Sequence, residues 1–588
     1  MNFTRTFDVL PYQAHKYEQP IALAHKTETR WQTYSTSDCI KIVDELSKAF
    51  LAYGIQHDDK IAIIASINSP EWNFVDLAMQ QIGAINVPIH ATTNNEELKF
   101  ILNYAEVKMC FVSSALLYRK VVKVQSQLTH LKAIYTFEKV AEAAHWKTLL
   151  PLGKQITDKS LNHIKTSVLE DDIATIIFTS GTTGTPKGVM LSHRNIVSNI
   201  KATLAVLPIG RNDRMMSFLP LSHIFERTVT YIYMAAGTSI YYSGISDLER
   251  NLQDIKPHYF TVVPRVLEKM FEKIERQGRQ LSGRQKKVFD WAIALGENYE
   301  LDVKKNLKYS IELKLAKKLV FSHLIKALGG EVRGLVIGAA ALQIRLAKIF
   351  SAAGIAICEG YGLTETSPVL TFNRFNAGGT ILGTVGVPIP SVDIRIAEDG
   401  EILVKGPNVM KGYYKRPDLT AEVIDEEEWL HTGDVGEWIK GRFLKITDRK
   451  KEIFKISTGR YVAPQPIEKK FRESAYIEQI MIVGSGEKYA GALIVPNWNS
   501  LLKFCKKNDV EAKKMSKAEI AKLPIVEQLF KDTLAKYNQH FTRTEQVRTY
   551  CLLQDVWTIK NGLLTPTFKL KRKAIFEKHQ ADIEKMYA

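Results

Sequence analysis

The stretch "TIIFTSGTTGTPKGVMLSH", residues 175–193, begins as a β-branched strand and continues into glycines, threonines and a lysine. Glycine permits close backbone approach, and Thr and Ser add hydroxyl and N–H groups, so this composition predicts a phosphate-binding loop. The Walker pattern places glycine before the lysine and a hydroxyl residue after it. Lys187 instead lies between Pro186 and Gly188, and a helix is expected directly after it. Taken alone, the same composition also suits an ordinary surface loop.

The overall composition is that of a globular chain with more than one domain. Its 588 residues exceed what one core usually holds, and 45% hydrophobic and 24% charged residues are ordinary values. The net charge of +17 would suit nucleic acid, an anionic membrane surface or polyanionic small substrates. The sequence contains no Lys/Arg tail and no RNA-binding aromatic motif, so no nucleic-acid partner is expected.

Cysteine usage and hydropathy indicate the compartment. Five scattered cysteines without a C-x-x-C pattern predict neither a disulfide framework nor a zinc site, and they favour a reducing cytoplasm. The first twenty residues lack the apolar run of a signal peptide, and the most apolar run, 229–242, is shorter than a membrane span. We therefore expect a soluble, cytoplasmic protein that can still associate peripherally with a membrane.

Strand-like and helix-like segments alternate through the first part of the chain. "KIAIIAS" (60–66) and "INVPIH" (85–90) flank a helical segment at 71–84, and "VKMCFVS" (107–113) follows another helix. This alternation predicts βαβ units and an α/β fold with parallel-rich sheets.

Three later regions change this texture. Residues 265–330 are Lys-rich and helical, with one apolar stripe (Val288, Trp291, Ala292, Leu295) and a stop at Gly329-Gly330. Short strands with turns at Gly400 and Gly441 predict a small β-barrel-like subdomain over about 385–447. We expect a large N-terminal domain at 1–447, a hinge at 448–452 and a small, mobile α+β C-terminal lid domain at 453–588.

Four further motifs accompany the glycine-rich loop: "EGYGLTETSP" (359–368), "WLHTGDVG" (429–436), "ITDRKKEIFKISTGRYVAPQPIE" (446–468) and "NGLLTPTFKLKR" (561–572). In this order they resemble the AMP-forming acyl-CoA synthetases of the adenylate-forming superfamily, over nearly the whole chain. "FLPLSHIFER" (218–227) and the helical insertion ending "KALGGEVRGLVIGAAAL" (326–342) are most similar to long-chain fatty acid–CoA ligases.

The resemblance implies a two-step reaction. A fatty carboxylate and ATP give acyl-AMP and pyrophosphate, and coenzyme A then displaces AMP, with Mg²⁺ as the metal. Three alternatives stay open: a medium-chain or aryl acid as substrate, transfer to a carrier protein, and a non-catalytic lipid-binding or scaffold protein that keeps the fold. The presence of Glu365, Asp434, Arg449 and Lys569 argues against the last.

The resemblance also implies the residues that bind ATP. Tyr361 would stack on adenine, Thr364 would donate to the α-phosphate, and Asp434 and Arg449 would hold the ribose. Thr183 and Glu365 would form the Mg²⁺ site, because Mg²⁺ takes hard oxygen ligands. The remaining nucleotide-binding residues would be Thr179, Ser180, Gly181, Thr182, Gly184 and Lys187 at the β- and γ-phosphates, with Gly338, Ala339, Ala340, Gly360 and Gly362 around the nucleotide.

Further residues would serve the chemistry and the second step. Lys569 would bridge the carboxylate and the α-phosphate. This chain reads T-F-K where many relatives read S-G-K, so Lys571 and Lys573 remain rival assignments. The resemblance makes Lys451 the hinge, places His223 between the acyl and pantetheine sites, and puts Gly459 and Arg460 on a loop that faces the site after domain rotation.

The acyl pocket and the membrane are less explicit in the sequence. Phe225, Tyr231, Ile337 and Leu342 would line an acyl tunnel or belong to the ordinary core. The amphipathic region 280–328 would meet anionic lipid or would simply pack on the core as a helical insertion.

Overall fold

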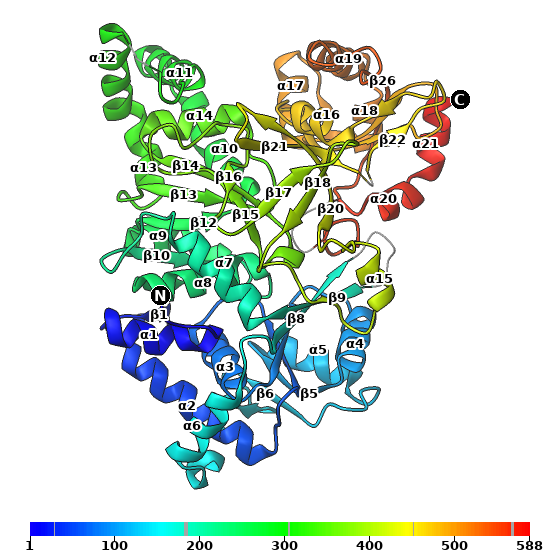
Figure 1. Cartoon of the computed structure of the whole chain (residues 1–588). Helices are drawn as coiled ribbons and strands as arrows, with labels where there is room; N and C mark the ends of the chain where they lie inside the picture. The colour runs from blue at the N-terminus through cyan, green and yellow to red at the C-terminus, as the bar shows by residue number, and fades with distance from the viewer. Residues whose placement is uncertain (29, 181–185, 304–305, 451, 566–569) are drawn as a thin grey trace. The chain divides into compact units, whose positions relative to one another are not determined.

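The computed structural model describes residues 1–28, 30–180, 186–303, 306–450, 452–565 and 570–588 (Figure 1). It divides into two compact units. Unit 1 comprises Met1–Arg395, Leu403–His431 and Trp438–Lys445, and unit 2 comprises Ile396–Ile402, Thr432–Glu437 and Ile446–Ala588. Two short segments of the expected β subdomain, 396–402 and 432–437, thus group with the C-terminal part of the chain.

Unit 1 contains an eight-stranded sheet built from the predicted βαβ units. Its strand order is β19-β9-β8-β4-β3-β5-β6-β7, and the strands from β8 to β7 pair in parallel. The strands are β3 (Lys60–Ala65), β4 (Ile85–His90), β5 (Val107–Val112), β6 (Ala133–Thr136), β7 (Ala144–His145), β8 (Ile173–Ser180), β9 (Pro186–Ser192) and β19 (Gly412–Tyr413). Helices α3 (Pro70–Gln81), α4 (Asn95–Tyr104) and α5 (Ala115–Gln125) connect them.

Unit 1 also contains a nine-stranded sheet. Its order is β16-β15-β14-β13-β12-β10-β11-β1-β2, and the strands from β14 to β1 are parallel. They are β1 (Leu23–Lys26), β2 (Trp31–Tyr34), β10 (Arg214–Ser217), β11 (Ser239–Tyr242), β12 (Tyr259–Val262), β13 (Gly334–Ile337), β14 (Ala356–Gly362), β15 (Val369–Phe372) and β16 (Val387–Pro388). Both sheets confirm the predicted α/β class.

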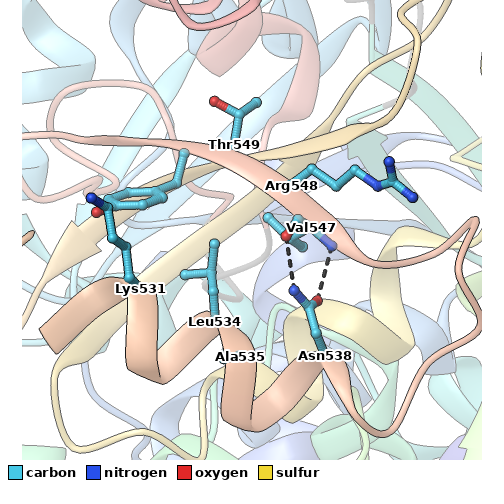
Figure 2. Close-up of a pocket in the computed structure, with 8 residues that line it drawn as sticks. Lys531, Leu534, Ala535, Asn538, Val547, Arg548 and Thr549 are labelled. Carbon is cyan, nitrogen blue, oxygen red and sulfur yellow. Dashed lines mark hydrogen bonds between the residues drawn. The ribbon is translucent and has the colours of Figure 1, made fainter. Parts of the chain in front are cut away.

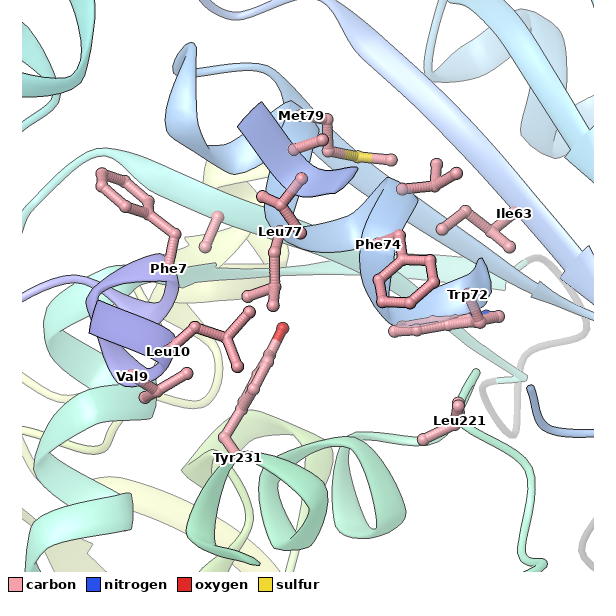
Figure 3. Close-up of a cluster of buried hydrophobic side chains, with 14 of the residues drawn as sticks. Phe7, Val9, Leu10, Ile63, Trp72, Phe74, Leu77, Met79, Leu221 and Tyr231 are labelled. Carbon is pink, nitrogen blue, oxygen red and sulfur yellow. The ribbon is translucent and has the colours of Figure 1, made fainter. Parts of the chain in front are cut away.

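The largest core cluster joins the two sheets through helices α1 (Val9–Lys16), α2 (Thr36–Tyr53), α3 and α8 (Ile224–Ala236). Figure 3 shows Tyr231 of α8 directed toward side chains of α1 and α3, among them Leu10 and Leu77. The apolar run 229–242 is therefore a buried helix followed by β11. Within the described residues, no helix is both long and apolar enough to span a bilayer.

The glycine-rich stretch begins with the expected strand, which is β8, and residues 181–185 of the expected loop lie outside the described residues, but no helix directly follows Lys187. Pro186–Ser192 is strand β9, which pairs antiparallel with β8 so that Lys187 lies opposite Thr179. Helix α7 (His193–Leu204) begins only at His193, where the Ser192 hydroxyl accepts the Asn195 N–H at 3.2 Å. Val189 and Leu191 are buried on one face, and β9 has partners on both edges, so sheet pairing extends the strand beyond the lysine.

The predicted helical insertion of unit 1 is helical. It contains α10 (Pro264–Gln280), α11 (Gly283–Glu297), α12 (Leu307–Ala316), the π-helical segment η5 (Lys317–Phe321) and α13 (Ser322–Ala327), and α14 (Ile344–Ala353) packs beside it. Trp291, Ala292 and Leu295 face the core as expected. Gly329 and Gly330 have φ of +102° and +92°, which fits the predicted helix stop because glycine tolerates positive φ.

Unit 2 has the predicted mixture of strands and helices. Its three-stranded sheet is β24 (Ile477–Val483), β25 (Ala490–Pro496) and β26 (Val547–Leu552), and β22 (Phe454–Lys455) pairs with β23 (Tyr461–Val462). The helices include α16 (Pro464–Phe471), α17 (Trp498–Lys507), α19 (Pro524–Asn538), α20 (Arg572–Lys578) and α21 (Gln580–Tyr587). Figure 2 shows a pocket between α19 and β26, where Asn538 exchanges two 2.9 Å hydrogen bonds with the Val547 backbone. None of the predicted site residues lines this pocket.

A four-stranded sheet contributes segments to both units. Its order is β17-β18-β20-β21, formed by β17 (Asp393–Ile396), β18 (Glu401–Lys405), β20 (Leu430–Ile439) and β21 (Phe443–Arg449). Gly400 and Gly441 have φ of +83° and +68°, as their predicted turn positions require.

Candidate active site

Several predicted site residues meet at one edge of the nine-stranded sheet. β10, β12, β13 and β14 are parallel neighbours, so their carboxyl ends share that edge. His223 follows β10, the segment 338–340 follows β13, and 361–365 ends and follows β14. Ligands of parallel α/β sheets bind outside the carboxyl ends of the strands, which makes this edge the candidate site.

Glu365 is tied to the strand that carries Lys187. Glu365 lies in the short helix η6 (Thr364–Thr366), and its Oε1 accepts a 3.0 Å hydrogen bond from the Tyr413 hydroxyl. The Lys187 Nζ lies 5.0 Å from the centre of the Tyr413 ring. Burial, and then the Glu365 carboxylate, raise the pKa of Tyr413 far above its usual value, so the hydroxyl remains a donor. Tyr413 therefore links the predicted phosphate-loop lysine to the predicted metal carboxylate.

Asparagines on α7 and after β18 hold the chain around Glu365. Asn199 Nδ2 donates to Val369 O at 2.7 Å, and its Oδ1 accepts the Val369 N–H at 3.2 Å. Asn195 donates to the carbonyls of 407 and 409, each at 2.8 Å, and Asn408 donates to Thr366 O at 2.8 Å. These amides and Tyr413 escaped the sequence analysis, although "HRNIVSN" (193–199) and "MKGYYKRP" (410–417) follow recognised segments and carry polar residues that end up buried.

Two of the predicted site glycines are required by the chain itself. A Cβ on Gly362 would lie 1.7 Å from Pro368 O, and one on Gly338 would lie 2.8 Å from the Phe225 ring. After Gly338 the chain becomes exposed at Ala339 and Ala340, and Ala339 has a φ of +68°. The exposed loop at the end of a buried strand leaves backbone groups accessible at the candidate edge.

His223 faces a second histidine that sequence reasoning did not single out. His223 is the N-cap residue of α8, and its ring centre lies 5.8 Å from that of His90 at the end of β4. Burial lowers the pKa of His90 to about 4, so its imidazole is neutral at physiological pH. The contact places the start of α8, after β10, beside the end of β4, and so links the two large sheets of unit 1.

The predicted tunnel residues are mostly core. Tyr231, Ile337 and Leu342 are fully buried. The Tyr231 hydroxyl hydrogen-bonds to Asp76 and Arg227 in a polar cluster, which assigns this side chain to the core rather than to an apolar tunnel. Phe225 is half-buried against Gly338 and is the member of the set that reaches the candidate edge.

In unit 2, Asp434 and Arg449 form a pair. Arg449 Nε lies 2.8 Å from Asp434 Oδ1, from neighbouring strands β21 and β20. Glu401 contacts the residue next to each member of this pair. It accepts the Gly433 N–H at 2.9 Å, and it forms an ion pair with Lys450 at 2.7 Å. About a third of the Arg449 side chain is exposed. The two residues assigned to the ribose are therefore neighbours.

Several predicted residues fall outside the described part of the chain: Gly181, Thr182, Thr183, Gly184, Lys451 and Lys569. Of the rival lysines, Lys573 is exposed and lies 3.9 Å from Glu577, and Lys571 directly precedes α20. Between them, Arg572 is held by Glu452 at 2.8 Å and Glu468 at 2.6 Å. Gly459, with φ +85°, and Arg460, which donates to Thr544 at 3.1 Å, lie in the turn between β22 and β23.

The structure describes one of the two residues assigned to Mg²⁺, Glu365, because Thr183 lies outside the described residues. Among the described residues, no group of three or more His, Cys, Asp or Glu side chains is placed to hold an ion. Mg²⁺ is commonly held by one or two carboxylates plus substrate phosphates, and the Glu365 carboxylate has the hard oxygen atoms that such a site requires.

Comparison with known proteins identifies the family of this chain. Residues 10–414 match the model of the AMP-binding enzymes, and 451–588 match the C-terminal domain of AMP-binding enzymes. Long-chain-fatty-acid–CoA ligase 1 of Cavia porcellus is 33% identical over 93% of this chain and 82% of its own length. Long chain acyl-CoA synthetase 4 of Arabidopsis thaliana is 33% identical, with 95% and 87% covered.

Solved structures share the fold. The adenylation domain of a carboxylate reductase from Mycobacterium chelonae superposes with a TM-score of 0.77 at 21% identity, covering 99% of this chain and 91% of that one. The corresponding domain from Segniliparus rugosus, in complex with AMP and a co-purified carboxylic acid, gives 0.73 at 20% identity, with 99% and 94% covered. The chain belongs to the AMP-binding enzyme family.

Proposed function

We propose that this protein is an ATP-dependent long-chain fatty acid–CoA ligase that works through an acyl-adenylate. The observation that carries the proposal is the cluster in which Tyr413 bridges Lys187 and Glu365, beside the carboxyl ends of the parallel strands. The long-chain ligases that match nearly the whole chain support the choice of substrate. We place the reaction in the cytoplasm, in keeping with five free cysteines.

In the first half-reaction, a carboxylate oxygen bonds to the α-phosphorus of ATP, and the bond to pyrophosphate breaks. Two anions must approach each other, so cations and N–H or O–H donors have to offset their repulsion. We assign Lys187 and the glycine-rich loop to the β- and γ-phosphates, Thr364 to the α-phosphate and Tyr361 to adenine. Asp434 and Arg449 would hold the ribose. Glu365 would hold Mg²⁺, which neutralises phosphate charge when bound.

In the second half-reaction, the sulfur of coenzyme A bonds to the acyl carbon, the thiol loses its proton, and AMP leaves. We assign His223 to the junction of the acyl and pantetheine groups. Lys451 would be the hinge, and Gly459 and Arg460 would belong to the surface used in this step. Lys569 would serve only the first step, since it stabilises charge shared between the carboxylate and the α-phosphate.

A chain-length profile tests the substrate. Purified protein is given ATP, coenzyme A and a series of acids from short to long, with benzoate included, and AMP release and thioester are measured. We expect oleate and palmitate to be used best. Equal or better turnover of benzoate would overturn the long-chain assignment. Acyl-AMP that accumulates in the presence of coenzyme A would indicate a carrier protein as the natural acceptor.

The lysine assignment has its own test. Lys569→Ala should abolish adenylation and leave thioester formation from supplied acyl-AMP nearly unchanged. Lys573→Ala is the matched control, because this lysine is exposed and beside Glu577, and both half-reactions should persist. If Lys571→Ala has the selective effect instead, Lys571 is the adenylation lysine. Equal loss of both half-reactions in Lys569→Ala would contradict the proposed role.

A further inference from the structure

Helix α12 and the segment η5 carry apolar side chains on two sides. Tyr309, Leu313, Ala316 and Val320 recur at helical spacing and belong to the core cluster of the insertion. The Tyr309 hydroxyl also donates to Leu295 O of α11 at 3.1 Å, and the two helices lie side by side (Figure 1). One side of the helix is therefore fully used by packing.

The opposite side is apolar as well, and it is exposed. Leu307, Ile311, Leu315 and Leu319 are 79%, 58%, 49% and 45% exposed. Leu307, Ile311 and Leu315 lie four residues apart in α12, so they follow a strip that drifts about 40° per step and spans about 12 Å, and Leu319 follows them in η5. Single exposed apolar residues are unremarkable, but four in one strip form a patch of the kind that marks an interaction site.

Lysines flank this strip. At 100° per residue, Lys308 and Lys314 flank the arc of Leu307, Ile311 and Leu315 by about 20° on either side, Lys318 precedes Leu319 in η5, and all three lysines are exposed. Glu312 is the only acidic residue between positions 303 and 327. We call Leu307, Ile311, Leu315 and Leu319 with Lys308, Lys314 and Lys318 the α12 face.

We propose that the α12 face docks on an anionic lipid bilayer, with its apolar side chains in the interface and its lysines at the headgroups. Apolar area together with basic charge is the composition of interfacial helices. Charge complementarity selects an anionic bilayer over a second copy of this chain, because two copies would bring the same lysines together. The proposal does not depend on the ligase reaction, so failure of either leaves the other standing.

Vesicle binding by the full-length protein tests the proposal. Co-sedimentation with phosphatidylcholine vesicles, with and without phosphatidylglycerol, measures partitioning. We expect binding to the anionic vesicles that weakens at high salt. The triple variant Ile311→Gln/Leu315→Gln/Leu319→Gln should lose about tenfold or more of that binding. Lys308→Gln, Lys314→Gln and Lys318→Gln should each lose roughly fivefold or less.

Matched variants separate this face from general surface effects. Leu116 and Leu169 are 77% and 62% exposed on other elements, so Leu116→Gln/Leu169→Gln should bind vesicles like the parent. Lys123→Gln, an exposed lysine elsewhere, controls for charge. Thermal melts and thioester formation in solution verify that each variant is folded. The proposal is overturned if the triple variant binds as well as the parent, if the parent does not bind anionic vesicles, or if sedimentation shows a dimer that only the triple variant disrupts.

Discussion

Two aspartate–arginine pairs in this protein differ in how far they are exposed to solvent. Asp76 and Arg227 are both fully buried, 2.5 Å apart, and join α3 to α8. Gln80 and Asn86 also donate to Asp76 Oδ1, at 2.7 and 2.6 Å. Asp434 and Arg449 form a similar 2.8 Å pair on adjacent strands, but the arginine is one-third exposed. The same chemistry gives a fully buried pair in the first case and a pair whose arginine reaches solvent in the second.

The buried pair should dominate stability. Asp76→Ala leaves the Arg227 guanidinium without its counter-charge in the core, and breaking such a pair costs about 3–5 kcal/mol. We expect unit 1 to unfold at much lower denaturant concentration, as measured by urea titration. Asp434→Ala is the matched variant and should cost less than Asp76→Ala, because the one-third exposed Arg449 can turn to solvent when its partner is removed. Equal destabilisation by the two would erase the distinction.

The partly exposed pair should dominate nucleotide binding. Asp434→Asn removes a charged acceptor, and a hydrogen bond to a charged group contributes about 1.5–3 kcal/mol, so kcat/KM for ATP should fall roughly 10- to 100-fold. Steady-state kinetics at saturating fatty acid and coenzyme A measure this, and a melt verifies folding. An unchanged kcat/KM for ATP would remove Asp434 from the nucleotide site.

Replacing both buried partners should cost less than removing one. Asp76→Leu/Arg227→Met leaves no uncompensated charge, and buried ion pairs are often replaceable by apolar residues at little net cost. We expect the double variant to lie within about 2 kcal/mol of the parent in urea titrations. The opposite result, a double variant less stable than Asp76→Ala, would mean that the hydrogen bonds of Gln80, Asn86 and Tyr231 to the charged pair contribute more than the uncompensated charge costs.

A buried aspartate for which no ion pair is found among the described residues sharpens the comparison further. Asp448 is 2% exposed, its Oδ2 has no hydrogen-bond partner among the described residues, and burial raises its pKa to about 7. Between the ordinary carboxyl value and about 7, the folded state holds a proton that the unfolded state releases, so stability falls as pH rises through this window. Asp448→Asn should reduce that slope, with a gain on the order of 1 kcal/mol near pH 8. Thermal melts of the parent and the variant from about pH 5 to about pH 8 measure this. An equal fall of stability with pH in both proteins would contradict the prediction.

Most of the fold can be predicted from local patterns in the sequence. The alternation around "KIAIIAS" and "INVPIH" predicts β3, α3 and β4 because period and length are readable in sequence. The insertion, its glycine stop and the C-terminal α+β region follow for the same reason. Lys187 is the counterexample, because β9 continues past it through pairing with β8 and β19, and pairing partners are not encoded locally.

By itself, the sequence determined the α/β class and the set of motifs that mark the family, because each depends on residues close together in the chain. Only the tertiary structure decided that Tyr413 stands between Lys187 and Glu365, that His90 faces His223, and that one side of α12 has no covering partner within the described chain. The physical reason is common to all three. Each depends on contacts between segments far apart in sequence, and those contacts are fixed by how the sheets and helices pack.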